Sequence, residues 1–126
     1  MPVQPTPNSG PLSGTRIVDL STVLAGPYAT MLLADLGAEV IKIEPPGGEI
    51  SRQVSDSYFA SLNRNKQSVC LDLRSEAGQQ KLGKLVAKSH ALLVNMKPSA
   101  IRRLGLTYED LRRFNEKIVC VALTGF

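Results

Sequence analysis

The chain has 126 residues, enough for one packed domain, because domains commonly hold about 100 to 150 residues. Its 43% hydrophobic and 21% charged residues are ordinary for a globular protein and argue against a disordered or fibrous chain. The net charge of +4 suits an anionic small ligand but does not by itself indicate nucleic acid.

The chain begins with a segment rich in Pro, Ser and Gly, residues 1–14. We expect this segment to be a flexible tail. It lacks both the charged start and the apolar stretch of a secretory signal. No apolar run in the sequence approaches the roughly 18 residues that cross a bilayer. We therefore expect a cytoplasmic protein that has no membrane partner.

Five apolar or β-branched runs predict strands, at residues 16–20, 39–44, 68–73, 91–95 and 118–123. Apolar residues at helical spacing and helix-capping residues predict helical segments at 28–36, 58–62, 76–88, 99–104 and 107–114. Gly37 is placed to close the first of these helices, and Ser75 to cap the third. Residues 45–57, with two prolines and two glycines, predict an irregular segment.

The alternation of strands with helices predicts an α/β class, Rossmann-like in a broad sense, with a mostly parallel sheet and helices on both faces. Residues 15–126 would form this single unit. The first strand is followed neither by the dinucleotide-binding glycine pattern nor by a P-loop. This absence argues against a nicotinamide-dependent or ATP-hydrolysing enzyme.

The cysteines and the single histidine predict structural roles. Cys70 and Cys120 both lie in alternating apolar runs, where a buried, reduced thiol is expected. His90 follows a predicted helix, where a structural role is favoured. No metal-ligand spacing occurs, so we expect no metal.

Two amides and two cations lie directly before the third predicted strand, in the run Asn63, Arg64, Asn65 and Lys66. Such a run can bind a phosphate through charge-assisted hydrogen bonds. A solvated polar turn explains the same residues equally well. Chemistry alone leaves both interpretations open.

Several blocks of the sequence, at residues 11–48, 62–73, 102–111 and 123–126, resemble the opening segments of the family III CoA transferases. This family, also called CaiB/BaiF, includes formyl-CoA transferases, carnitine CoA-transferases and α-methylacyl-CoA racemases. The blocks follow one another in the family's order. The resemblance implies a CoA-binding, Rossmann-like amino-terminal part, incomplete relative to the full family fold.

The resemblance also implies a set of CoA-binding residues, namely Lys42, Leu62, Lys66, Asn95 and Arg103. The three cations would contact phosphates or the nucleotide side of CoA. The segment around Asn95 departs from the family pattern, because Met96 replaces an aromatic residue and Ser99 replaces a glycine.

The full-length relative is implied to be an acyl-CoA transferase that moves CoA between carboxylic acids through an aspartyl intermediate. The family's catalytic aspartate follows the motif found here at residues 124–126, so we expect no catalytic residue within this chain and no activity from it alone. The alternatives are a racemase of the same family and a non-catalytic CoA- or nucleotide-binding module.

The implied partners are acyl-CoA and carboxylic acid substrates, and the implied full-length assembly is an interlocked homodimer. A nucleic acid partner is not expected, because only three Tyr and three Phe accompany the basic residues. A cut piece of a longer product and a natural short product fit the sequence equally well.

Overall fold

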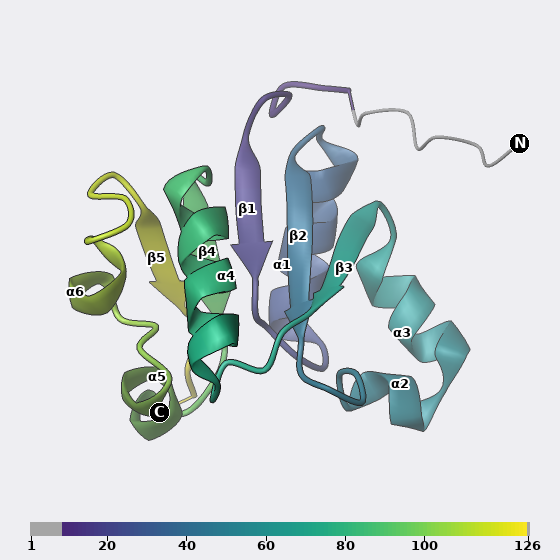
Figure 1. Cartoon of the computed structure of the whole chain (residues 1–126). Helices are drawn as coiled ribbons and strands as arrows, with labels where there is room; N and C mark the ends of the chain where they lie inside the picture. The colour runs from purple at the N-terminus through teal and green to yellow at the C-terminus, as the bar shows by residue number, and fades with distance from the viewer. Residues whose placement is uncertain (1–8, 126) are drawn as a thin grey trace, which may run out of the picture.

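A five-stranded parallel sheet in the order β3-β2-β1-β4-β5 forms the centre of the computed structural model, which describes residues 9–125 (Figure 1). The strands are β1 (Arg16–Asp19), β2 (Glu39–Glu44), β3 (Lys66–Cys70), β4 (Ala91–Val94) and β5 (Val119–Ala122). The predicted α/β class with a parallel sheet is confirmed.

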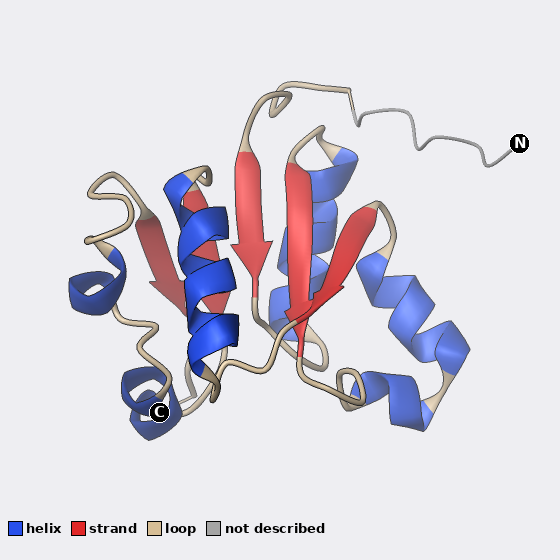
Figure 2. Ribbon diagram, viewed as in Figure 1, coloured by secondary structure: helices blue, strands red, loops and turns tan. Residues whose placement is uncertain are grey.

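Helices cover both faces of this sheet (Figure 2). The helices are α1 (Ala25–Asp35), α2 (Ser51–Val54), α3 (Asp56–Asn63), α4 (Glu76–Ala87), α5 (Pro98–Arg103) and α6 (Tyr108–Leu111). Helix α1 lies behind the sheet and α4 lies in front of it.

Strand β1 is the point at which the order of the strands reverses. It pairs with β2 on one side and with β4 on the other. The chain crosses behind the sheet through α1 on its way to β2, and returns in front of it through α4 on its way to β4. In parallel α/β sheets, ligands bind at the carboxyl ends of the strands beside such a reversal.

The larger hydrophobic core lies between the sheet and α4. Val18, Leu92, Leu82 and Val86 are almost completely buried there. Burial of a Leu or Val side chain contributes about 1.5–3 kcal/mol, so these contacts fix α4 against β1 and β4. A second core, which includes Ile17 and Val40, contains the small residues Ala34 and Ala38.

Three residues, two of them at helix ends, have the structural roles that the sequence predicts. Gly37 ends the first helix with a φ of 104°, a left-handed conformation that favours glycine. Ser75 caps α4, because its side chain accepts a hydrogen bond from the Gly78 N–H. His90 accepts a hydrogen bond at Nδ1 from the Arg16 N–H, at 3.0 Å, which is a structural role.

Two predicted segments differ from the structure. Residues 51–54 form the short helix α2 within the segment that was expected to be irregular. Arg52 in this turn pairs with Glu44 at 2.9 Å and stacks on the Phe59 ring at 3.7 Å. These contacts between segments stabilise a turn that the local sequence does not favour. The third strand starts and ends earlier than expected, at residues 66–70.

The prediction that both cysteines are buried is wrong for Cys70, which is exposed, whereas Cys120 is half-buried. Strand β3 lies at the edge of the sheet and leaves Gln67 and Ser68 exposed as well. An alternating pattern predicts a strand but does not show whether the strand is central or at an edge. Both thiols are free.

The tail expected at residues 1–14 falls largely on residues 1–8, which lie outside the described part of the chain. Close to the first strand, the Leu12 N–H donates to the Leu36 carbonyl oxygen at 2.9 Å, which ties this segment to the end of α1. The boundary between tail and domain stays a prediction. Within residues 9–125, no helix has the length and apolar character needed to cross a membrane.

Candidate functional site

A pocket of about 230 Å³ opens at the carboxyl-terminal edge of the sheet, on the side of α4. It is formed by Ile43 of β2, by residues that follow four neighbouring strands, and by the end of α5. Its lining consists of Leu20, Thr22, Ile43, Pro45, Pro46, Leu71, Asp72, Leu73, Arg74, Met96, Arg103 and Leu104. This is the edge at which the reversal at β1 predicts a ligand.

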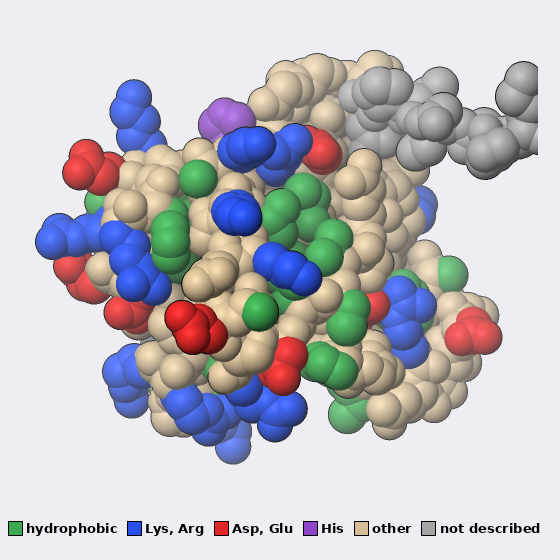
Figure 3. All heavy atoms as spheres, viewed as in Figure 1, with side chains coloured by type: hydrophobic (Ala, Val, Ile, Leu, Met, Phe, Trp, Pro, Cys, Tyr) green, Lys and Arg blue, Asp and Glu red, His purple; other side chains and the backbone are tan. Residues whose placement is uncertain are grey.

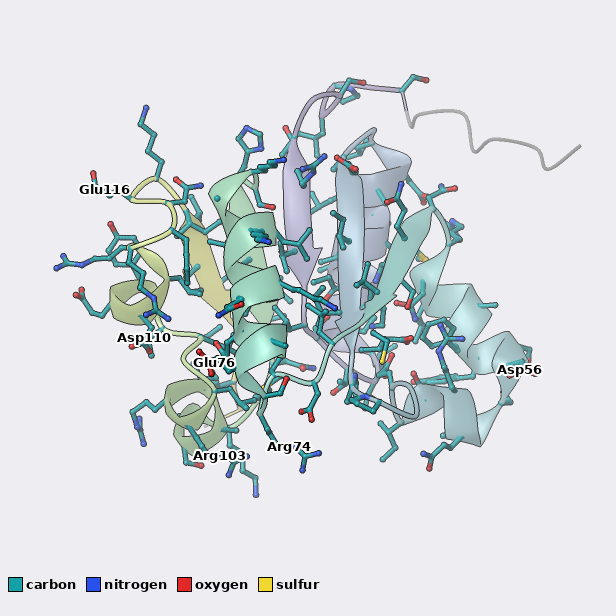
Figure 4. The ribbon with its side chains drawn as sticks, viewed as in Figure 1. Asp56, Arg74, Glu76, Arg103, Asp110 and Glu116 are labelled. Atoms are coloured by element: carbon teal, nitrogen blue, oxygen red, sulfur yellow. The ribbon has the colours of Figure 1, made fainter. Side chains whose placement is uncertain are left out.

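The walls of the pocket are mostly apolar, and two arginines belong to its lining. Arg74 follows β3 and Arg103 ends α5, and both side chains are exposed to solvent. In Figure 4 the two side chains lie at the same lower edge of the molecule. Figure 3 shows Lys and Arg side chains gathered along this edge. Apolar walls beside guanidinium groups suit a ligand with an apolar part and an anionic part.

Helix α4 begins directly beside the pocket wall. Gly78 in its first turn lies so close to the Asp72 carbonyl oxygen that a Cβ atom would come within 1.9 Å of it. Ser75 donates to the same oxygen at 2.8 Å. The β3–α4 turn, which carries Arg74, is therefore held firmly against the start of the helix.

Lys66 lies on the other face of the sheet, in a buried ion pair with Asp19. Its ammonium group is 2.9 Å from Asp19 Oδ2 and also donates to the Pro27 carbonyl oxygen and to Asn63 Oδ1, at 2.9 and 2.8 Å. The two side chains of the pair are 2% and 0% exposed. The ammonium group carries three N–H donors, and these three acceptors can occupy all of them.

Burial and the neighbouring charges oppose each other at Asp19. Burial raises the pKa of the Asp19 carboxyl, but the Lys66 and Lys42 ammonium groups and the hydroxyls of Ser21 and Thr30 outweigh it, so its pKa lies below the usual value. Burial lowers the pKa of Lys66, an effect that the Asp19 carboxylate opposes. Asp19 is therefore a stable carboxylate at neutral pH.

A second buried ion pair joins Lys42 to Glu49, whose Oε2 is 3.1 Å from the ammonium nitrogen. Both side chains are 1% exposed. Lys42 also donates to the Ser21 carbonyl oxygen at 2.9 Å, and Glu49 Oε1 accepts from the Val23 N–H at 2.8 Å and from Ser51 Oγ at 2.5 Å.

The carboxyl of Glu49 is stabilised in its charged form. Burial raises its pKa, but the Ser51 hydroxyl, the Val23 N–H and Lys42 lower it by more, so the pKa lies below its usual value. Glu49 is therefore a carboxylate at neutral pH.

Asn95 binds the backbone of Thr22 twice. Its Oδ1 accepts from the Thr22 N–H at 2.9 Å, and its Nδ2 donates to the Thr22 carbonyl oxygen at 2.7 Å. Thr22 itself lines the pocket. The amide of Asn95 thus fixes part of the pocket wall.

The model of the family described as CoA-transferase family III matches residues 12–126 of the chain. The chain belongs to CoA-transferase family III. The suspected family is therefore confirmed.

Named relatives of this family III chain are CoA-transferases. It is 39% identical over 122 residues to the formyl-CoA:oxalate CoA-transferase of Streptomyces coelicolor, which covers 91% of this chain and 30% of that protein. It is 40% identical over 124 residues to the succinyl-CoA:glutarate CoA-transferase of Mus musculus, with 92% and 28% covered. The chain thus spans about 30% of the length of these relatives.

Solved structures of similar proteins share the fold. The Mycobacterium tuberculosis protein Rv3272 superimposes with a TM-score of 0.88 at 40% identity, over 94% of this chain and 35% of that one. A CaiB/BaiF family protein from Brucella suis gives a TM-score of 0.88 at 35% identity, over 93% and 34%.

The five residues that the resemblance indicated in this family III chain occupy different places. Among these five described residues, only Arg103 lines the pocket. Asn95 holds Thr22 from outside the lining, and Leu62 is buried near the end of α3. Their contacts with a ligand stay predictions.

Lys42 and Lys66 are brought together on the α1 face, around Asp19. Ile43 lines the pocket on the α4 face, and successive side chains of a strand point to opposite faces, so Lys42 points away from the pocket. A phosphate could bind to Lys66 only in exchange for its present hydrogen bonds.

Arg74 is the basic residue of the pocket lining that the sequence analysis did not select. A signal for it was present, because it closely follows a predicted strand, and the carboxyl ends of parallel strands meet at one edge. Among residues 9–125, no group of three or more His, Cys, Asp or Glu side chains is arranged to hold a metal ion.

Proposed function

We propose that the pocket binds coenzyme A or acyl-CoA, and that the chain is the CoA-binding amino-terminal part of an acyl-CoA transferase. The observation that carries this proposal is the apolar pocket at the strand reversal with Arg74 and Arg103 in its lining. CoA combines anionic phosphates with a less polar arm, and arginine binds phosphate through paired N–H donors. The names of the relatives support CoA as the ligand.

In this proposal Arg103 and Arg74 contact the phosphates. Asn95 acts on the ligand through Thr22, which it holds in the pocket wall. Lys42 and Lys66 stabilise the loops from the α1 face through their ion pairs, and Leu62 is buried near the end of α3.

The proposed reaction moves CoA between carboxylic acids, with a catalytic aspartate that follows residue 126 in a longer chain. The aspartate carboxylate attacks the thioester carbonyl carbon and the C–S bond breaks. The CoA thiolate departs, and an acyl-aspartyl anhydride forms on the enzyme. The thiolate then attacks the aspartyl carbonyl carbon and releases the first carboxylate. An acceptor carboxylate collects CoA from the resulting aspartyl thioester by the reverse steps. The pocket assists by holding CoA close while it is detached.

The assembly, location and substrates of the full-length protein belong to the same proposal. The full-length protein would act as a homodimer in the cytoplasm, on acyl-CoA and carboxylic acids and without a metal. The CoA-transferase names of the relatives support a transferase in preference to a racemase.

Calorimetric titration of the chain with CoA tests the proposal. We expect Arg103→Ala to weaken binding about 10-fold or more, because a hydrogen bond to a charged group contributes about 1.5–3 kcal/mol. Arg102→Ala is the matched control, since this arginine is exposed on the same helix but does not line the pocket. Equal losses for the two variants would show only a general charge effect, and absence of binding by the unaltered chain would refute the proposal.

A further inference from the structure

The loop between β1 and α1 contains a strained residue. Val23 has a φ of 68°, in the left-handed region that β-branched residues rarely adopt. The residue is 47% exposed, so burial of the valine does not offset the strain. Strained residues persist where the surrounding structure holds them, and they cluster at ligand-binding segments.

Side chains from two other loops hold this strained loop. Glu49, from the loop after β2, accepts the Val23 N–H at 2.8 Å. Asn95, directly after β4, binds both backbone polar groups of the preceding residue, Thr22. The backbone groups of these two consecutive residues are therefore held by three hydrogen bonds to side chains that are distant in the sequence.

Glu49 is itself rigidly placed. Its side chain is 1% exposed, its Oε2 faces the Lys42 ammonium group, and its Oε1 accepts from Ser51. Lys42 also binds the Ser21 carbonyl oxygen, two residues before Val23. The ion pair therefore holds the β1–α1 loop at two points.

The held loop forms part of the pocket. Thr22 lines one side, and Pro45 and Pro46, which lie between β2 and Glu49, line another. Glu49 thus links two pocket walls, although it does not line the pocket itself.

We propose that Glu49 is a positioning residue that holds Val23 in its left-handed conformation and thereby fixes Thr22 in the wall of the pocket. A wall that is ordered before binding loses less conformational freedom when the ligand arrives, which strengthens binding. This inference rests on the proposed function, because CoA is the ligand whose affinity Glu49 would raise.

Two variants of Glu49 separate the effect of its charge from the effect of its hydrogen-bond acceptor. Glu49→Gln keeps an oxygen that can accept the Val23 N–H but loses the charge, whereas Glu49→Ala removes the acceptor. Glu44→Gln is the matched control. Glu44 is a buried carboxylate at the end of β2, the strand that precedes the Glu49 loop. Its side chain pairs with Arg52 and accepts a hydrogen bond from Ser68 Oγ. None of its hydrogen bonds that we observe reaches the β1–α1 loop.

The first measurement needs no ligand. We expect hydrogen exchange at the Val23 amide to become at least about 10-fold faster in Glu49→Ala, to accelerate less in Glu49→Gln, and to stay unchanged in Glu44→Gln, because a protecting bond slows local exchange. Unchanged Val23 exchange in Glu49→Ala would overturn the proposal.

The second measurement is CoA affinity under conditions in which every variant is folded. We expect a loss of about 10-fold for Glu49→Ala, a smaller loss for Glu49→Gln, and no change for Glu44→Gln. Equal affinities for the Glu49 and Glu44 variants would refute the positioning role while leaving the CoA site intact. If the unaltered chain binds no CoA, the proposed function fails, and exchange at Val23 alone decides whether Glu49 holds the loop.

The third measurement concerns the strain itself. Val23→Gly removes the need to force a valine into this conformation. We expect the loss of stability on Glu49→Gln to be smaller in the Val23→Gly background than in the unaltered chain. Strictly additive losses would contradict the view that Glu49 stabilises a strained Val23.

Discussion

The two faces of the sheet use their cations in different ways. On the α4 side, Arg74 and Arg103 are exposed in the lining of a pocket. On the α1 side, Lys42 and Lys66 are buried and paired with carboxylates. The exposed cations can serve a ligand, whereas removal of a buried cation leaves an uncompensated charge. A basic residue in a binding motif thus contributes either to affinity or to stability, depending on the face to which it points.

The largest expected effect is a loss of stability in Lys66→Ala. This change leaves the Asp19 carboxylate buried without its ion-pair partner, which costs about 3–5 kcal/mol of the free energy of unfolding. Urea unfolding measures the change. Arg64→Ala is the control from the same segment, because its pair with Asp35 is exposed and contributes little. Similar losses for the two variants would contradict the distinction between buried and exposed pairs.

The second-largest expected effect is a loss of stability in acid, through the buried carboxylates of the α1 side. The pKa values of Asp19 and Glu49 are lowered in the folded protein, so their contribution to stability is complete above the unfolded values of about 4. It is lost as the pH falls from about 4 through the lower folded values. Unfolding by urea between pH 7 and pH 3 should show this loss, and Glu49→Gln should show a shallower one below about pH 4. A flat profile would argue against stabilised carboxylates.

The smallest expected effect is on stability when Arg74 is replaced by Ala. Its side chain is 80% exposed, and its pair with Asp72, at 3.3 Å, lies at the surface. Surface pairs contribute about 0–1 kcal/mol, so the urea midpoint should hardly move. CoA binding should weaken by less than in Arg103→Ala, because Asp72 already competes for the guanidinium group. A large loss of stability would place Arg74 among the structural cations.

Much of the fold was predictable because its signals are local. The alternating apolar run of β2, Gly37 and the Ser75 cap were each predicted from a few neighbouring residues and are confirmed. Strand β3 was misplaced, since an edge strand is polar and its limits depend on pairing with β2. The prediction that Cys70 is buried was wrong for the same reason.

The site was predictable only in part. The family resemblance indicated Arg103, which lies at the pocket, but burial of Lys42 and Lys66 depends on Glu49 and Asp19, whose contacts are long-range. One local signal was present. Lys42 lies between two isoleucines in β2, and this alternation places it on the face opposite Ile43.

The exposed thiol at the edge of the sheet offers a position for a reporter group. Cys70 is exposed, whereas its neighbour Leu71 lines the pocket. The other thiol, Cys120, is half-buried, and burial raises its pKa, which makes it less reactive toward maleimides at neutral pH. A fluorophore could therefore be attached selectively at residue 70, one residue from the pocket wall and outside the pocket lining.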